Sequence, residues 1–395
     1  MPSIETQVVE HLYRSLLGRE PDEGAAVNCA AHLASGGTVE ELRAMITGSE
    51  EYRVRQRPKS DHPLAHIGAV WREENLSYFT HRGRYRPLSL TIETVNICNN
   101  DCVICPYSAQ TRRKQAMPMD LFARVVDGYT EIGGGPVGLT PMVGEILLDK
   151  LLLERLKMLR AAPAVTAVSA ISNASMAHLY TDAELAEILS HFDRLAISIY
   201  GLDAEEFRLM ARKDGYDRFR AGLVRILAIM GPERVTLGAR QLRRRPAAEV
   251  EEWGAAVARD AGVDPAAVTV HTTSTYANWG VFDTGKPLPM DAEWLPVRQN
   301  TAQCALPLIS LQILSDGTVS FCGCANFDGT SELNLGNVRD ISLRDLLGSE
   351  RVRRLWNWDE FGIPDFCKSC SFHMPVQALA GLPSAFPEPL RTFGG

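Results

Sequence analysis

Three cysteines stand close together in the segment TVNICNNDCVICPYS, residues 94–108. They are Cys98, Cys102 and Cys105, and the next cysteine lies about two hundred residues further along the chain. Zinc sites and most iron–sulfur centres use four protein ligands, so three thiolates leave such a centre incomplete. A [4Fe–4S] cubane needs one ligand for each iron, and three thiolates would leave the fourth iron open to an exchangeable small molecule. The spacing predicts such a cluster, with part of a zinc site as the alternative.

A second set of cysteines lies near the C-terminus. Cys304, Cys322 and Cys324 are followed, after a long gap, by Cys367 and Cys370 in a C-x2-C pair. Eight of the nine cysteines in the chain are therefore grouped, and the total is odd. Grouping and an odd count favour metal ligation over a disulfide framework.

The composition is that of a globular protein without a general affinity for polyanions. The 395 residues are 45% hydrophobic, and 41 basic against 48 acidic residues give a net charge of −7. This balance predicts no binding to nucleic acid or to an anionic membrane. The N-terminus has no signal-peptide pattern, and no apolar run of about 18 residues occurs, so a cytoplasmic location is expected.

Residues 87–290 alternate short β-rich runs with helical patterns. The six β-rich runs are LSLTIETVN, VGLTPMV, VTAVSAIS, RLAISIY, RVTLGAR and VTVHTT. The helical patterns lie at about 118–132, 149–161, 181–191, 203–230 and 246–261. This alternation predicts parallel βα units and an α/β fold, an open (βα)6 version of the eight-stranded TIM barrel. The three cysteines would follow the first strand, at the end where such barrels carry their chemistry.

The regions before and after residues 87–290 do not show this alternation. Residues 1–57 have helical spacing of apolar residues and predict a small helical module, and residues 58–86 read as a linker. Residues 291–395 predict a β-hairpin that turns at Asp316-Gly317, then a helix in SLRDLLGSERVRRLW and the last two cysteines. The N-terminal pattern LYRSLLGREPD, with HLASGG and EEYR, resembles a short helical domain related to phycobilisome linker domains.

The C-x3-C-x2-C spacing after the first strand of a βα barrel resembles the radical S-adenosylmethionine (SAM) superfamily. The resemblance implies that the open iron is chelated by the amino and carboxylate groups of SAM. It also implies that one electron from the cluster cleaves SAM to methionine and a 5′-deoxyadenosyl radical, which abstracts a hydrogen atom from the substrate. One departure is Ile104, directly before the last cysteine, where many members of the family have an aromatic residue.

Further segments match the SAM-binding positions of this family. Gly144 and Glu145 match the Gly-Glu segment that receives the SAM amino group. Ser172 and Asn173, after the third strand, match polar positions that face the ribose or the methionine part of SAM. The segment ISIYGLDAEEFRLM resembles the S-x-x-G-x-x-x-E segment that follows the fourth strand and places Ser198 at the site. Arg240, after the fifth strand, could pair with the SAM carboxylate or with an anionic substrate.

The later cysteines, together with Gly317, resemble the auxiliary-cluster extension of SPASM and twitch radical SAM enzymes. The short, twitch-like form is favoured, with one auxiliary [4Fe–4S] cluster. Its expected ligands are Cys304, Cys322, Cys367 and Cys370. A structural zinc ion on the same four thiolates is the alternative. Cys324 is then left over, and it could be packed, replace Cys322 as a ligand or donate a hydrogen atom.

Two clusters suggest that a substrate radical loses a second electron to the auxiliary cluster and leaves as an oxidised product. We expect an oxidoreductase acting on a small polar molecule such as a sugar or aminocyclitol, with a flavodoxin or ferredoxin-type electron donor. Loss of a hydroxyl proton would need a base, and His271 and Tyr200 are candidates by position. The alternatives are a SPASM-type maturase with a peptide substrate, a radical epimerase with Cys324 as the donor, and a zinc-binding interaction protein without catalysis.

Overall fold

The computed structural model describes residues 3–52 and 87–375, apart from residues 18, 50, 88, 140–141, 298, 302, 324, 330–331 and 357. Two compact units divide the chain, Met1–Val70 and Trp71–Gly395. Cys324, the expected linker and the C-terminal tail lie outside the described residues. No helix among the described residues is long and apolar enough to cross a membrane.

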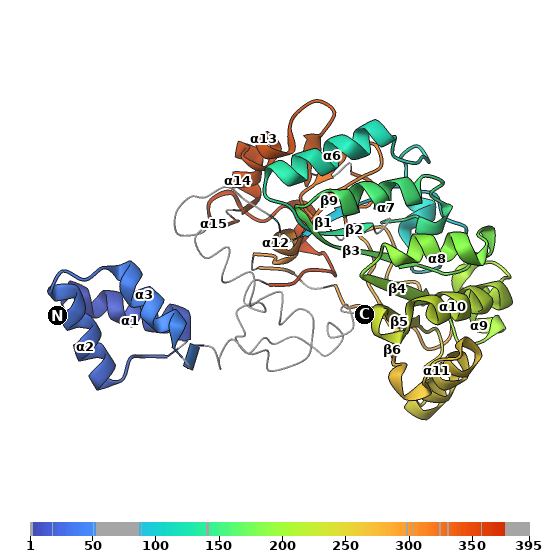
Figure 1. Ribbon diagram of the computed structural model, residues 1–395, viewed down its shortest axis with the longest axis horizontal. Coiled ribbons are helices and arrows are strands. Elements are labelled where there is room, and N and C mark those ends of the chain that lie inside the picture. Colours follow the sequence, from blue (N-terminus) through green and yellow to red (C-terminus); the bar gives the residue numbers. More distant parts are fainter. Residues whose placement is uncertain are drawn as a thin grey trace. The chain divides into compact units, whose positions relative to one another are not determined.

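The first unit contains the helices α1 (Ile4–Leu17), α2 (Glu23–Ala34) and α3 (Val39–Gly48) (Figure 1). The helical N-terminus expected from the sequence is therefore present. Thr38 begins α3 with a capping box, in which its hydroxyl and the Glu41 side chain each bond to the other residue's backbone N–H. The core of this unit consists of Val9, Leu12, Leu17, Leu42 and Ile46.

A nine-stranded sheet organises the second unit, in the order β11-β10-β9-β1-β2-β3-β4-β5-β6. Six of its strands follow one another in the same order in the chain and in the sheet. They are β1 (Ser89–Ile92), β2 (Gly135–Leu139), β3 (Val165–Ser172), β4 (Arg194–Ile199), β5 (Val235–Arg240) and β6 (Val270–Thr273). Each of these pairs in parallel with the next along the chain. This is the partial barrel that the alternation of strands and helices predicts.

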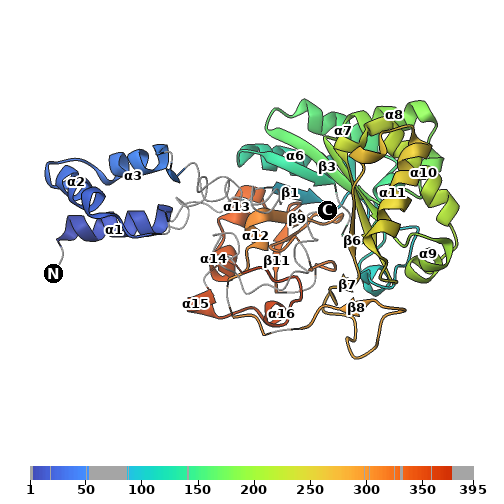
Figure 2. The ribbon, with the colours of Figure 1, turned by 90° about the horizontal axis from the view of Figure 1, so that it is seen from below.

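Helices cover the outer side of these strands (Figure 2). They are α6 (Met119–Glu131), α7 (Leu152–Ala161), α8 (Asp182–Ser190), α9 (Ala204–Ala211), α10 (Tyr216–Met230) and α11 (Ala247–Ala261). In α6 the apolar residues recur at helical spacing and are buried against the sheet, as in Leu121, Val125 and Tyr129. Short 3-10 turns lie at Pro106–Ala109, Ile146–Leu148, Ala177–Leu179, Pro232–Arg234 and Pro265–Ala267.

The helix expected over residues 203–230 is two helices, α9 and α10. Arg212 ends α9 in the left-handed conformation with φ 53°, and Gly215 follows with φ 151°. Both angles are incompatible with a continuous right-handed helix.

The C-terminal region begins with the small elements β7 (Thr275–Tyr276), β8 (Glu293–Trp294) and α12 (Leu306–Ile309). The expected hairpin follows as β9 (Ser310–Ile313) and β10 (Thr318–Ser320), which pair antiparallel around Gly317 with φ 91°. After β11 (Asn334–Asn337) come α13 (Leu343–Leu347), α14 (Glu350–Trp356), α15 (Trp358–Phe361) and α16 (Asp365–Lys368). The helix expected in SLRDLLGSERVRRLW is thus divided between α13 and α14.

The hairpin does not form a separate sheet. Strand β9 pairs in parallel with β1, from Ser89 opposite Ser310 to Ile92 opposite Ile313. The Ser89 hydroxyl also donates to the Ile309 carbonyl at 2.8 Å. The C-terminal region therefore continues the barrel sheet beyond its first strand.

A buried ion pair strengthens this junction. Both guanidinium Nη atoms of Arg112 bond to the Glu93 carboxylate, at 2.7 and 2.8 Å, and the Ser315 N–H donates to the same carboxylate. Arg112 Nε donates to the Phe327 carbonyl. The Glu93 side chain is fully buried and that of Arg112 is 8% exposed. One charge pair thus joins the end of β1, the segment after the three cysteines and the turn after β9.

We predict that Arg112→Met lowers the free energy of unfolding of this unit by about 3–5 kcal/mol, because it leaves Glu93 as an unpaired buried charge. Urea unfolding of the full chain measures this. Arg259→Met is the control, since its pair with Glu252 is exposed and contributes about 0–1 kcal/mol. Adding Glu93→Met to Arg112→Met should recover stability; equal stability of Arg112→Met and the control would contradict the assignment.

Candidate functional site

The three clustered cysteines line a cavity of about 300 Å³. The rest of the lining comes from the segment after β2, from the ends of β3 to β6 and the segments that follow them, and from Gly323 and Phe372 of the C-terminal region. The cavity therefore lies at the C-terminal ends of the parallel strands. Burial raises the pKa of Cys98 to about 12 and that of Cys105 to about 11. Burial raises the pKa of Cys102 well above its usual range, and the charges of Cys105 and Cys98 raise it further. The three sulfur atoms therefore lie close enough to influence one another.

A carboxylate orders the part of the cavity lining that lies next to Cys98. Glu145 is buried and accepts the Ser172 hydroxyl at 2.6 Å, the Asn173 backbone N–H at 2.7 Å and the Leu147 N–H at 3.2 Å. Burial raises the pKa of Glu145, and these hydrogen bonds oppose the rise. Asn173 Nδ2 points toward the loop of the three cysteines, 3.9 Å from Cys98 Sγ. Glu145 thus fixes Ser172 and Asn173 at the cavity, next to Gly144.

Ser198, Tyr200 and Arg240 line the cavity at the ends of β4 and β5. A side-chain hydrogen bond from Tyr200 lowers the pKa of Cys102, against the larger effect of burial. Burial raises the pKa of Tyr200 well above its usual range, so its hydroxyl keeps its proton at neutral pH. Among the described residues, no carboxylate forms an ion pair with Arg240. Tyr200 is therefore placed to donate a hydrogen bond rather than to act as a base, and Arg240 presents a positive charge to a ligand.

The ends of β4 and β5 are held together by a buried glutamate from the segment that resembles the family pattern. Glu206 accepts the backbone N–H groups of Leu242 and Arg243 and forms an ion pair with Arg245 at 2.9 Å. Gly201, with φ 94°, passes so close that a Cβ there would lie 2.7 Å from the Glu206 side chain. The residue that performs this role is Glu206, one position after the glutamate of the sequence pattern.

The structure does not bring His271 to the cavity. Its side chain is exposed, and the cavity begins two residues later at Thr273. Strand β6 ends at Thr273, as the run VTVHTT predicts, and with a rise of about 3.3 Å per residue His271 lies two residues below that end. The role of His271 as a base stays a prediction, and the lining of this cavity does not include it. The proposed roles of Cys324 concern a residue outside the described part of the chain.

Aromatic side chains that line this cavity were not predicted from the sequence. Trp279, which has φ 54°, donates from Nε1 to the Ile104 carbonyl at 2.9 Å. Its ring meets those of Phe372 and Phe327 edge to face, with centroids 4.7 and 6.4 Å away. Trp279 therefore connects the loop of the first three cysteines, just before Cys105, to the C-terminal region. The aromatic residues in TYANW, directly after the sixth strand, were the available signal.

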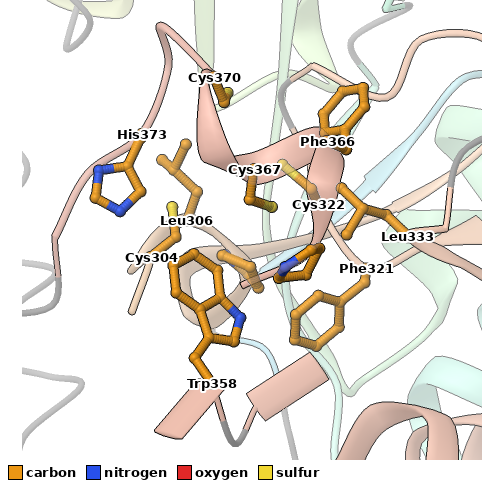
Figure 3. A pocket seen from close by; sticks show the side chains of 12 residues that line it. Cys304, Leu306, Phe321, Cys322, Leu333, Trp358, Phe366, Cys367, Cys370 and His373 are labelled. Carbon is orange, nitrogen blue, oxygen red and sulfur yellow. The ribbon is translucent and has the colours of Figure 1, made fainter. Parts of the chain in front are cut away.

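The later cysteines line a second cavity (Figure 3). The four thiols belong to Cys304, Cys322, Cys367 and Cys370. Burial raises the pKa of Cys304 and of Cys370 to about 12, and that of Cys367 further still. The charge of Cys322 raises the pKa of each of these three, so all four sulfur atoms are neighbours. Around them stand mainly apolar side chains, such as Phe321, Leu333 and Phe366.

Seven thiols that line two cavities are the soft donors that iron–sulfur clusters require. Within the described ranges, no group of three or more His, Cys, Asp or Glu side chains is arranged to hold a single metal ion. The donor sets fit a cluster with three protein ligands in the first cavity and one with four in the second.

A hydrophobic cluster lies between the two cavities. Its members are Ala277, Leu295, Ala325 and Phe372, with Trp279, Leu306, Phe366 and Cys370 packed against them. Phe372 and Trp279 line the first cavity, whereas Leu306, Phe366 and Cys370 line the second. The sites are thus separated by apolar side chains.

Comparison with known protein families agrees with this geometry. The model of the radical SAM superfamily matches residues 92–239, and that of the SPASM iron–sulfur cluster-binding domain matches residues 304–371. The chain is a radical SAM enzyme with a SPASM domain. A radical SAM domain binds a [4Fe–4S] cluster and SAM, and a SPASM domain binds auxiliary iron–sulfur clusters. Clusters therefore take the place of the zinc alternative at both sites.

The chain is similar to several solved structures. The crystal structure of SuiB from Streptococcus suis has a TM-score of 0.50 and 12% sequence identity, over 96% of this chain and 91% of that one. The structure of anSMEcpe with bound AdoMet has a TM-score of 0.49 and 15% sequence identity, over 78% of this chain and 95% of that one. The structure of BtrN in complex with AdoMet and 2-DOIA has a TM-score of 0.45 and 14% sequence identity, over 71% of this chain and 89% of that one. No curated protein matches the sequence.

We predict that Glu145→Gln weakens SAM binding by about 10- to 100-fold. The amide presents N–H where Glu145 accepts N–H or O–H groups, and a hydrogen bond to a charged group contributes about 1.5–3 kcal/mol. Equilibrium dialysis of cluster-loaded protein with SAM measures the Kd. Glu187→Gln, at an exposed ion pair on α8, is the control. An unchanged Kd in Glu145→Gln would show that the hydrogen bonds of Glu145 to Ser172 and Asn173 do not affect SAM binding.

Trp279→Phe should weaken SAM binding by about 2- to 12-fold. It keeps an aromatic ring but removes the hydrogen bond that holds Ile104, a loss of about 0.5–1.5 kcal/mol. Trp294→Phe is a matched control, because Trp294 Nε1 donates to the Lys286 carbonyl at the same distance of 2.9 Å but does not line the cavity. The same dialysis compares the two variants, and equal affinities would show that the contact with Ile104 does not act on the site.

Proposed function

We propose that this radical SAM enzyme is an oxidoreductase that oxidises a small polar substrate, such as a sugar or an aminocyclitol, and passes an electron to the auxiliary cluster. The observation that supports this most directly is the pair of thiol-lined cavities, with the hydrophobic cluster around Phe372 as an apolar partition between them. When bound, the first cluster and SAM supply the 5′-deoxyadenosyl radical that removes a hydrogen atom from the substrate. The substrate radical then gives up one electron and one proton to become the oxidised product.

The roles of the residues at the first cavity follow from their positions. Cys98, Cys102 and Cys105 hold the first cluster, and the wall that Glu145 orders binds SAM. Because three thiols would hold a cluster of four irons, one iron would remain available to SAM. The cavity is closed on the side of the C-terminal region by Trp279, which also limits the entry of water.

The remaining polar groups of the cavity support a small polar substrate. Ser198 and Tyr200 offer hydroxyl groups at one side, and Thr273 and Thr275 line the other. Arg240, free of a carboxylate partner within the described residues, binds the SAM carboxylate or an anionic group of the substrate.

The second cavity supplies the electron acceptor. Cys304, Cys322, Cys367 and Cys370 hold the auxiliary cluster on the far side of the hydrophobic partition. Because the partition excludes water, the electron moves between groups of low solvation, whose charge changes require little solvent reorganisation. An electron donor of the flavodoxin or ferredoxin type would supply the electron for each cleavage of SAM.

The first test is anaerobic reconstitution with iron and sulfide, followed by SAM and a strong reductant. We expect about eight irons per chain, because each of two cubanes has four, and 5′-deoxyadenosine formation in the wild type. Cys102→Ala should abolish this formation. Cys29→Ala, in the N-terminal helical unit, should retain it. Formation of 5′-deoxyadenosine in Cys102→Ala would contradict the assignment of the first cluster.

The substrate class is tested by the fate of carbon-bound deuterium. Deuterated aminocyclitols and amino sugars are incubated with the reduced, loaded enzyme, and mass spectrometry examines both products. Oxidation should place deuterium in 5′-deoxyadenosine and yield a product that has lost two hydrogen atoms in total. Transfer from peptides alone would show a peptide maturase, and a product of unchanged hydrogen content would show an epimerase.

A further inference from the structure

One buried donor that lines the second cavity has no hydrogen-bond acceptor in the part of the chain that the structure describes. Trp358, at the start of α15, is 9% exposed, and its Nε1 has no hydrogen-bond partner among the described residues. Other tryptophans differ: Trp253 donates to Tyr216 Oη, and Trp279 and Trp294 donate to carbonyls, each at 2.9 Å. A buried N–H without an acceptor costs about 1–3 kcal/mol, so Trp358 is the exception that needs an explanation.

The surroundings of Trp358 indicate which acceptor is missing. Trp358 lines the same cavity as the four thiols, and Figure 3 shows the six-membered ring of its indole toward Cys304 and its nitrogen on the side of Phe321, which also lines the cavity. The ring of His373 stacks on the indole, with centroids 6.1 Å apart and planes inclined by 24°. This contact restrains the plane in which the N–H group lies. With four sulfur ligands around the cavity, sulfur is the acceptor that loading the site would bring to this donor.

We propose that Trp358 Nε1–H donates a hydrogen bond to a sulfur atom of the auxiliary cluster and thereby raises its reduction potential. Reduction adds one electron and no proton, and the added charge spreads onto the sulfur atoms. An N–H dipole directed at sulfur stabilises the reduced state more than the oxidised state, and hydrogen bonds to sulfur are among the factors that set cluster potentials. Trp358 is a positioning residue for electron acceptance. The inference rests on the auxiliary cluster of the proposed function and not on the identity of the substrate.

The decisive variant is Trp358→Phe, which keeps an aromatic ring and removes the N–H group. It is made in a full-length parent with Cys98→Ala, Cys102→Ala and Cys105→Ala, so that the auxiliary cluster is the only one. Iron is counted, and the midpoint potential is measured by titration with dithionite followed by electron paramagnetic resonance. We expect a lower potential than in the parent, of the order of a tenfold weaker reduction equilibrium, or about 59 mV for one electron.

Trp253→Phe in the same parent is the matched control, because it removes an indole N–H on α11, away from both cavities. Its potential should equal that of the parent. A Trp358→Phe potential equal to that of the control would overturn the proposal. A parent that binds no iron would overturn both this proposal and the proposed auxiliary cluster, whereas an unshifted potential in a loaded parent overturns only the role of Trp358.

A second measurement decides the case in which Trp358→Phe does not load a cluster. The parent is labelled with ¹⁵N at the indole nitrogen, and pulsed resonance of the reduced cluster is recorded in H₂O and D₂O. We expect a coupled ¹⁵N and an exchangeable proton, both retained when Trp279→Phe removes the other indole near the partition. Absence of the ¹⁵N coupling, or its loss in Trp279→Phe, would overturn the proposal.

Discussion

The parallel pairing of β1 with β9 is the interaction on which the arrangement of both sites depends. Strand β1 leads directly into the loop of the first three cysteines, and β9 lies between Cys304 and Cys322. Because the backbones of the two strands bond to each other, both sets of thiols are attached to one continuous sheet. The buried pair of Glu93 and Arg112 holds the same junction from the side. The separation of the sites is therefore set by sheet geometry and not by a flexible connection.

The two cavities lie so close together that consecutive residues of the chain line different cavities. Cys322 faces the second cavity, while Gly323 lines the first; Phe372 lines the first, and His373 the second. At Gly323 the chain runs so near to Ser310 that a Cβ would lie 3.0 Å from its carbonyl oxygen. The partition is thus about one residue thick at these points. A side chain larger than glycine at position 323 would press on the first residue of β9.

Local patterns in the sequence were sufficient for the alternation of strands and helices, the hairpin at Gly317 and the grouping of the thiols. They were insufficient where distant contacts decide. Nothing near residue 310 indicates that β9 pairs with β1, and the contact of Trp279 with Ile104 joins residues 175 positions apart. The end of β6 was predicted at Thr273, where the structure has it, but the sequence alone did not show that the His271 side chain is exposed and lies outside the cavity lining. The indole of Trp358, which has no acceptor among the described residues, can be recognised only from the positions of residues distant in the sequence.

The position of β1 inside the sheet also has a consequence for biosynthesis. Ser89 and its partner Ile309 are 220 residues apart, so one edge of β1 has no partner until almost the whole enzyme has left the ribosome. At about 5–20 residues per second, that interval is about 10 to 40 seconds. An apolar strand with a free edge invites pairing with other chains during such a delay. The yield of correctly folded enzyme should therefore depend on the speed of translation and on chaperones that cover this edge, more than on the stability of the finished barrel.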